Sequence, residues 1–236
     1  MHETDRTPGY VIDLGPQASL PIVGSPLRFA VGRIYCVGRN YADHAREMGH
    51  DPDREPPFFF MKPANAIVQN GSTIAYPVGT ADCHHEIELV VAIGKGGSSI
   101  AADKALDHVW GYGVGLDMTR RDLQGQAKKL GRPWEMGKAF DESAPMTALV
   151  PAASIGHPAQ GAIWLRVNGQ MRQQGDLALQ IWNVQDQISH LSRLVTLQPG
   201  DLIMTGTPAG VGPVHKGDQL EGHVDGIGDL RIAYAP

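Results

Sequence analysis

The sequence lacks several features that mark large classes of protein. Its Lys and Arg residues are scattered, its net charge is −5 and it has no long basic run, which argues against nucleic acid as a partner. Its longest apolar runs are far too short to cross a bilayer. Residues 1–20 contain acidic and turn-forming residues but no apolar stretch of the secretory-signal type, so we expect no secretion.

Cysteine and aromatic residues are also scarce. Cys36 and Cys83 belong to no metal-binding or redox motif, and both are flanked by strand-like sequence. We therefore expect two buried free thiols, which fits a reducing cytoplasm. Aromatic residues make up 6% of the chain, whereas 29 Gly and 17 Pro without a collagen-like period indicate many turns between short strands.

A length of 236 residues is enough for one large domain with a short appendage. Residues 1–30 are interpreted as a lead-in segment whose prolines and glycines break any regular element, and residues 31–236 as a single catalytic domain. The patterning predicts strands at 34–38, 58–61, 86–93 and 202–204, a hairpin around Asn168-Gly169, a helical turn at 101–107, and helices at 40–49, 119–130 and 184–195.

Three carboxylates carry the strongest chemical signal. Glu86 and Glu88 lie two residues apart in an apolar strand, so both side chains should point to the same face. Two like charges on a buried face repel and are costly to desolvate, and a divalent cation held by carboxylate oxygens would compensate them. Alternatively, this face is solvated and the two glutamates pair with Lys or Arg across the strand.

Asp117 favours the metal site over that alternative. It ends the glycine-rich apolar stretch 109–116, where the backbone can come close to a ligand. Three acidic groups at the edges of buried strands together predict a metal site.

Other polar residues could take part in catalysis or substrate binding. His44 and Glu47 lie three apart on a short predicted helix, so a Glu-oriented His could activate water, although such a pair is also common on a helix surface. Lys62 and Lys138 sit among apolar neighbours, where each either extends to the surface or binds an anion or developing oxyanion. Arg121 and Gln124 could hold a substrate carboxylate or carbonyl. The loop at Thr207 either offers N–H groups and a hydroxyl to an oxyanion or is a plain tight turn.

Five ordered blocks of this chain resemble the fumarylacetoacetate hydrolase family, over a region that runs from about residue 33 to the C-terminus. The blocks are Tyr35-Cys36-Val37-Gly38-Arg39-Asn40-Tyr41-Ala42-Asp43-His44, Phe60-Met61-Lys62-Pro63, His84-His85-Glu86-Ile87-Glu88-Leu89, Gly115-Leu116-Asp117-Met118-Thr119-Arg120-Arg121-Asp122 and Thr205-Gly206-Thr207-Pro208-Ala209-Gly210-Val211-Gly212. The resemblance implies a mainly β (α+β) fold, a mixed β-sandwich roll with a few short helices, assembled as a homodimer.

The resemblance also assigns roles to the candidate residues. Glu86, Glu88 and Asp117 match positions that bind a divalent metal, with Mg²⁺ expected and Mn²⁺ or Ca²⁺ as alternatives. His44 and Glu47 match the water-activating pair. The remaining matches line the family's site: Lys62, Arg121, Gln124, Lys138 and Thr207.

Among the branches of this family, the chain is similar to the short bacterial fumarylpyruvate hydrolases of gentisate degradation. It departs from the larger family members at Val37-Gly38, where those carry a further acidic ligand, and we expect water in that coordination position. The implied reaction cleaves a C–C bond of a 2,4-dioxo acid, giving fumarate and pyruvate from fumarylpyruvate. In this hypothesis Arg39, Arg46 or Arg121 holds the distal carboxylate, while Lys138 and the Thr207 loop steady the oxyanions.

Several alternatives stay open at this point. Acylpyruvases and oxaloacetate decarboxylases share most of the blocks, and these enzymes or a related isomerase would use the same metal site. A metabolite-binding protein on the same scaffold is the alternative without catalysis. The presence of His44, Glu47, Lys62 and Lys138 argues against it, because a binding protein has no need of a water-activating pair.

Overall fold

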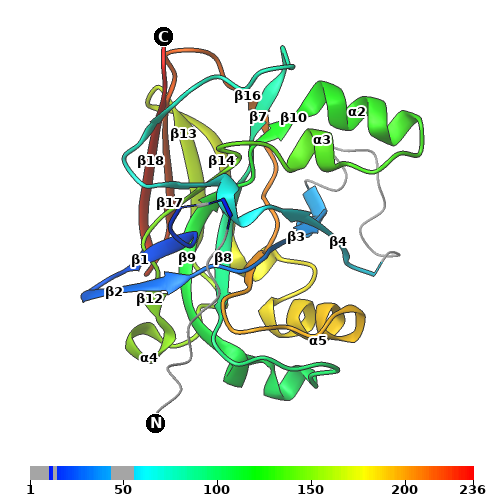
Figure 1. Cartoon of the computed structure of the whole chain (residues 1–236), viewed down its shortest axis with the longest axis vertical. Coiled ribbons are helices and arrows are strands. Elements are labelled where there is room, and N and C mark those ends of the chain that lie inside the picture. The colour runs from blue at the N-terminus through cyan, green and yellow to red at the C-terminus, as the bar shows by residue number, and fades with distance from the viewer. Residues whose placement is uncertain (1–10, 13–14, 44–55) are drawn as a thin grey trace.

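The computed structural model describes residues 11–12, 15–43 and 56–236, and the chain there folds mainly into β-strands with a few short helices (Figure 1). This confirms the expected fold class. No helix among the described residues is long and apolar enough to cross a membrane.

A large curled sheet forms the centre of the molecule and carries the strands predicted from apolar runs. Its strand order is β4-β3-β15-β8-β9-β11-β5, and β12 pairs with β9 outside this path. The pairing is mixed, because β15 and β3 run parallel whereas β8 runs antiparallel to both of its neighbours. The strands are β3 (Ile34–Gly38), β4 (Phe58–Lys62), β5 (Ile67–Gln69), β8 (Ile87–Ile93), β9 (Val109–Leu116), β11 (Ala144–Met146), β12 (Val150–Pro151) and β15 (Leu202–Met204).

A second sheet covers one face of the first, and two smaller sheets complete the β-structure. The second sheet has the order β14-β13-β17-β18-β6 and contains the predicted hairpin, which turns at Asn168-Gly169. The small sheets are the β1-β2 hairpin and the β10-β7-β16 sheet. Their strands are β1 (Ser19–Ile22), β2 (Ser25–Ala30), β6 (Thr73–Ile74), β7 (Cys83–His85), β10 (Thr119–Arg120), β13 (Ala162–Val167), β14 (Gln170–Asp176), β16 (Gly212–Pro213), β17 (Gln219–Val224) and β18 (Gly228–Tyr234).

The alternation of β8 explains how the core is divided. Ile87, Leu89 and Val91 pack into a cluster shared with the second sheet, whereas Val90 and Ala92 face a separate cluster with β3 and β15. β8 is buried along its whole length, and all of its residues except Glu88 are apolar. Cys36 and Cys83 are buried free thiols, as expected.

Short helices lie at the periphery of the sheets. In Figure 1, α2 and α3 lie beside the small sheet that contains β7 and β10, while α5 lies at the opposite end of the molecule. α5 packs against η2, and its Val184, Ile188 and Leu191 are buried in the core. The helical elements are η1 (Ala64–Ala66), η2 (Ala102–His108), α2 (Arg121–Lys129), α3 (Glu135–Lys138), α4 (Ala152–Ile155), η3 (Leu177–Leu179) and α5 (Val184–Leu194).

Two sequence-based predictions about elements need correction. The prediction that residues 1–30 lack regular structure is wrong for 19–30, because β1 and β2 form a hairpin that turns at Val23-Gly24. Pro21 has no N–H to donate, but its carbonyl accepts a hydrogen bond from the backbone N–H of Leu149, outside the hairpin. The predicted helix at 119–130 begins two residues later, because Thr119 and Arg120 pair with β7. Most of the predicted helix at 40–49 lies outside the described residues.

Candidate functional site

The three predicted carboxylates meet where neighbouring strands of the large sheet end. Glu86 connects β7 to β8, Glu88 is the second residue of β8, and Asp117 directly follows β9. The antiparallel register of β8 and β9 brings these positions together, and the backbone N–H of Asp117 donates to the Glu86 carbonyl. Each side chain offers an oxygen that lies within 4.8 Å of the other two. The sheet therefore assembles the acidic trio that the sequence predicted.

Positive side chains compensate two members of this trio. Lys138 Nζ lies 2.7 Å from Glu86 Oε2 and 2.6 Å from Asp117 Oδ2, and it donates a third hydrogen bond to Thr119. Lys62 Nζ lies 2.9 Å from Asp117 Oδ1 and also donates to the backbone carbonyls of Met118 and Lys138. Burial would lower the pKa of Lys138, but the charges of Asp117 and Glu86 outweigh burial and raise it.

Glu88 is the member without an ion pair to any described side chain. It is buried, and among the described residues its carboxylate makes no ion pair and accepts a hydrogen bond only from the backbone N–H of Gly206, at 2.7 Å. Burial raises the pKa of Glu88 well above its usual range, and the nearby charges of Asp117 and Glu86 raise it further. An additional positive charge would relieve this repulsion.

The trio has the donor set of a divalent metal site. All three side chains offer oxygen ligands, which hard cations such as Mg²⁺ and Mn²⁺ prefer, and their oxygens are close enough to share one ion. Such an ion would supply the charge that Glu88 lacks. The residues present therefore fit a divalent metal.

Helix α2 places two predicted substrate-binding residues beside the trio. Arg121 and Gln124 lie three apart and hence on one face of the helix, with an Arg121 N–H donating to the Gln124 side-chain oxygen at 2.8 Å. A second nitrogen of Arg121 lies 2.5 Å from Glu86 Oε1. Because Arg121 already pairs with Glu86, it is not a free cation for a distal carboxylate.

The loop at Thr207 is held against the trio by buried amide groups. Gln173 donates to the Thr207 hydroxyl at 2.7 Å, and Asn40 donates to the Thr205 carbonyl. Gly206 has φ +96°, and a Cβ there would lie 2.6 Å from that of Asn40, so only glycine fits this close approach. The loop thereby turns the Gly206 N–H toward Glu88.

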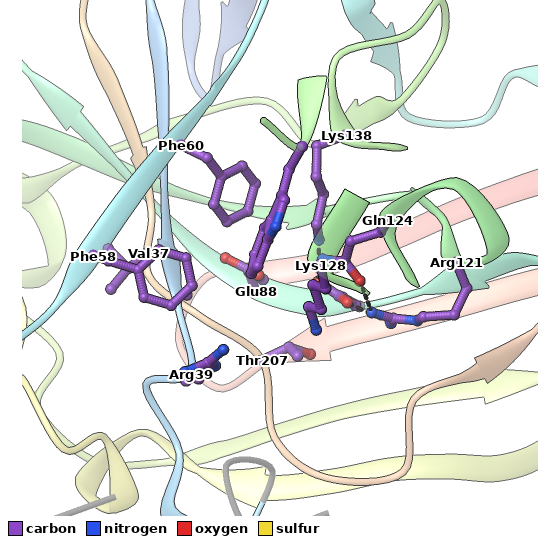
Figure 2. A pocket seen from close by; sticks show the side chains of 13 residues that line it. Val37, Arg39, Phe58, Phe60, Glu88, Arg121, Gln124, Lys128, Lys138 and Thr207 are labelled. Atoms are coloured by element: carbon purple, nitrogen blue, oxygen red, sulfur yellow. Dashed lines mark hydrogen bonds and ion pairs between the residues drawn. The ribbon is translucent and has the colours of Figure 1, made fainter. Parts of the chain in front are cut away.

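These residues surround one cleft (Figure 2). Phe58, Phe60 and Trp134 form an apolar wall, and the acidic trio contributes Glu86 and Glu88. The rest of the lining is Val37, Gly38, Arg39, Arg121, Gln124, Lys128, Lys138 and Thr207. A cleft that combines one apolar wall with convergent charged groups is suited to a small polar ligand.

The predicted residues fall into three groups by position. Arg39, Arg121, Gln124, Lys138 and Thr207 line the cleft. Lys62 lies behind it, so direct contact between Lys62 and a substrate stays a prediction. His44, Glu47 and Arg46 lie outside the described residues, and their predicted roles stay predictions.

The sequence analysis missed Lys128 and Trp134 in this lining. A signal for Lys128 was present, since it follows Arg121 and Gln124 at helical spacing of seven and four residues. Trp134 offered no such signal, because its place beside Phe58 depends on the packing of α3 against β4.

The chain is similar to known proteins over most of its length. Residues 33–233 match the model of the fumarylacetoacetate (FAA) hydrolase C-terminal family. The structure of a fumarylpyruvate hydrolase from Pseudomonas aeruginosa in complex with Mn²⁺ and pyruvate is 54% identical, with a TM-score of 0.94 over 96% of this chain and 99% of that one.

Two curated relatives have different activities. A fumarylpyruvate hydrolase from a Ralstonia species is 46% identical over 80% of this chain and 99% of its own length. The mouse mitochondrial oxaloacetate tautomerase FAHD1 is 44% identical over 84% of this chain and 90% of its own length. The match over most of the chain and its agreement with the site identify this protein as a member of the fumarylacetoacetate hydrolase family.

Proposed function

We propose that this protein is a metal-dependent hydrolase that cleaves fumarylpyruvate, a 2,4-dioxo acid, into fumarate and pyruvate, as in gentisate degradation. The observation that carries the proposal is the buried acidic trio in a cleft lined by Arg39, Arg121, Lys128 and Lys138. Such a cleft is suited to an anionic oxo acid. Similarity to fumarylpyruvate hydrolases at 54% and 46% identity supports this choice of substrate.

In this proposal Glu86, Glu88 and Asp117 hold the metal, which we propose to be Mg²⁺. When bound, the metal acts as a Lewis acid toward the 2-oxo acid end of the substrate. Mn²⁺ in the Pseudomonas aeruginosa structure supports a divalent ion of this type. The chain's own part is to fix three carboxylates beside Lys138, which limits the excess negative charge of the site.

The water-activating step is assigned to His44 and Glu47 from the family resemblance. His44, oriented by Glu47, takes a proton from water as the oxygen adds to the 4-carbonyl carbon of the fumaryl group. The C3–C4 bond then breaks, its electron pair stays on C3 as pyruvate enolate, and protonation of C3 gives pyruvate. Lys138 and Thr207 lie on the cleft wall, where they can steady oxyanions in this sequence.

The direct test follows the ultraviolet absorbance of fumarylpyruvate in the presence of Mg²⁺ and, separately, of EDTA. Fast loss of absorbance that EDTA abolishes is the expected result. His44→Ala should lower kcat by roughly 10²–10⁴-fold and leave Mg²⁺ binding intact. Unchanged turnover in His44→Ala would remove this residue from the mechanism.

Oxaloacetate tautomerisation is the second candidate, because a mammalian tautomerase is 44% identical over most of both chains. Tautomerisation also acts at the 2-oxo acid end of its substrate but breaks no C–C bond. Three parallel assays separate the activities. Interconversion of enol and keto oxaloacetate reports a tautomerase, pyruvate release from oxaloacetate reports a decarboxylase, and loss of fumarylpyruvate reports the hydrolase. Mg²⁺-dependent thermal stabilisation without turnover of any of these acids would favour a metabolite-binding protein instead.

We further propose a cytoplasmic homodimer. The two buried free thiols fit a reducing compartment, and the family resemblance supports the dimer. Sedimentation equilibrium of the full chain tests the assembly, and a monomer mass would contradict it.

A further inference from the structure

Lys128 differs from Arg121, Lys138 and Lys62 in its ion pairing within the described part of the chain. Each of those three cations pairs with a carboxylate of the trio. No described carboxylate pairs with Lys128, and its ammonium instead lies 4.9 Å from the centre of the Trp134 ring. A half-buried ammonium that faces a cleft and has no counter-ion among the described residues has a position suited to a bound anion.

The surroundings of Lys128 are electrostatically unfavourable without such an anion. Burial, together with the positive charges of Arg121 and Arg39, lowers the pKa of Lys128 to about 8. An anion bound between these cations would remove the repulsion. The cation cluster is therefore preorganised for a negative ligand group.

Arg39 reaches the same cleft from the end of β3, as Figure 2 shows. Its backbone is left-handed, with φ +58°, a conformation that non-glycine residues rarely adopt. Its guanidinium lies 5.2 Å from the centre of the Phe58 ring, and that ring packs directly on Gly38. Backbone and ring together fix the direction of Arg39.

The aromatic rings join these two cations into one wall. Phe58 contacts Trp134 edge-on, with ring centres 5.2 Å apart, so the supports of Arg39 and Lys128 touch each other. An unsaturated acyl chain could lie against this apolar surface while its terminal carboxylate meets the two cations.

We propose that Lys128 and Arg39 form the subsite for the distal carboxylate of the substrate, with Lys128 selecting dicarboxylic 2,4-dioxo acids over those with a neutral acyl group. This inference rests on the proposed function, because it takes the 2-oxo acid end to lie at the acidic trio.

The first experiment compares kcat/KM for fumarylpyruvate and for acetylpyruvate, whose acyl group is neutral, in Mg²⁺-loaded protein. Lys128→Met should lower the ratio of the two values by roughly 10- to 100-fold, mainly through the KM for fumarylpyruvate. Lys128→Arg should restore much of the ratio. Lys129→Met is the matched control, since Lys129 is an exposed neighbour outside the cleft and its loss should leave both values unchanged. An equal fall for both substrates, or no fall, would overturn the proposal.

A second experiment does not require turnover. Tryptophan fluorescence reports binding of fumarate and of monomethyl fumarate to the Mg²⁺-loaded protein. The wild type and Lys129→Met should prefer fumarate, and Lys128→Met should lose most of this preference. If no 2,4-dioxo acid is cleaved yet the preference depends on Lys128, the proposed function fails while the subsite stands. A preference that is the same in Lys128→Met and the wild type would refute the subsite.

Discussion

Lys138 and Asp117 form a buried ion pair, with 2.6 Å between Nζ and Oδ2 and side chains that are 2% and 1% exposed. The same ammonium also contacts Glu86 and Thr119, so all of its three N–H donors are directed to oxygen atoms. Lys138 is thus a fixed counter-ion of the acidic trio. A divalent metal bound to the trio would have to share these oxygens with it.

Lys138→Met should therefore lower the stability of the metal-free protein and increase the stabilisation by Mg²⁺. Without metal, we expect the free energy of unfolding to fall by about 3–5 kcal/mol, because buried carboxylates lose their counter-ion. The gain in stability on adding Mg²⁺ should be larger than in the wild type, since the site then carries one positive charge fewer. Urea denaturation with and without Mg²⁺ measures both quantities. A smaller Mg²⁺ gain than in the wild type would contradict this account.

Glu88→Gln should have the opposite effect on the metal-free protein. The substitution keeps the shape of a buried side chain and removes a charge that no described cation compensates, so metal-free stability should rise by about 1–3 kcal/mol. The stabilisation by Mg²⁺ should be largely lost. Thermal unfolding with and without Mg²⁺ provides the measurement. Glu135→Gln, at an exposed position of α3, is the control and should retain the full Mg²⁺ response.

The acidic trio could be predicted because its physical basis is local in sequence. Charge within an apolar strand is conspicuous, and Glu86, Glu88 and Asp117 all flank or interrupt such strands. The predicted hairpin at Asn168-Gly169 and the amphipathic helix at 184–195 likewise depended on local patterns and were confirmed.

The remaining features of the site depend on contacts between distant segments. Gln173 supports Thr207 across 34 residues, and Asn40 supports Thr205 across 165. Their amide side chains carry no sequence pattern that identifies these partners. Lys62 shows the same limit, since only the fold reveals that its ammonium is directed to Asp117 and two backbone carbonyls.

Gly38→Ala should disturb the cleft through the Phe58 ring. A Cβ at Gly38 would lie 2.0 Å from Phe58 Cζ, so the ring that supports Arg39 and Trp134 must move. We expect stability to fall by about 1–3 kcal/mol and kcat/KM for fumarylpyruvate to fall at least about tenfold.

Gly125→Ala is the matched control for Gly38→Ala. A Cβ at this exposed position of α2 would meet no atom within 4 Å. Because alanine favours the helix, the control should gain about 0.5–1 kcal/mol of stability and keep its activity. Equal activity in the two variants would show that the position of the Phe58 ring does not matter for turnover.

His223, which does not line the cleft, should make the free energy of unfolding depend on pH. Its Nδ1 lies 2.6 Å from Asp229 and its Nε2 3.0 Å from Asp225, so both ring nitrogens face carboxylates. Burial would lower the pKa of His223, but these two neighbours outweigh burial and raise it. Protonated His223 therefore stabilises the fold below its unfolded pKa of about 6.5, and this contribution is lost as pH rises through the higher folded pKa.

His223→Gln should accordingly be less stable than the wild type at about pH 5.5 and nearly equal to it at about pH 8.5. Urea denaturation of both proteins across this range measures the difference. Asp229→Asn removes one of the two carboxylates, so in that background the contribution of His223 should be smaller and disappear at lower pH. The His223 ring also stacks on Trp164, with ring centres 5.1 Å apart. If the stability difference between His223→Gln and the wild type grew with pH, the neutral ring would stabilise the fold through this stacking and not through its charge.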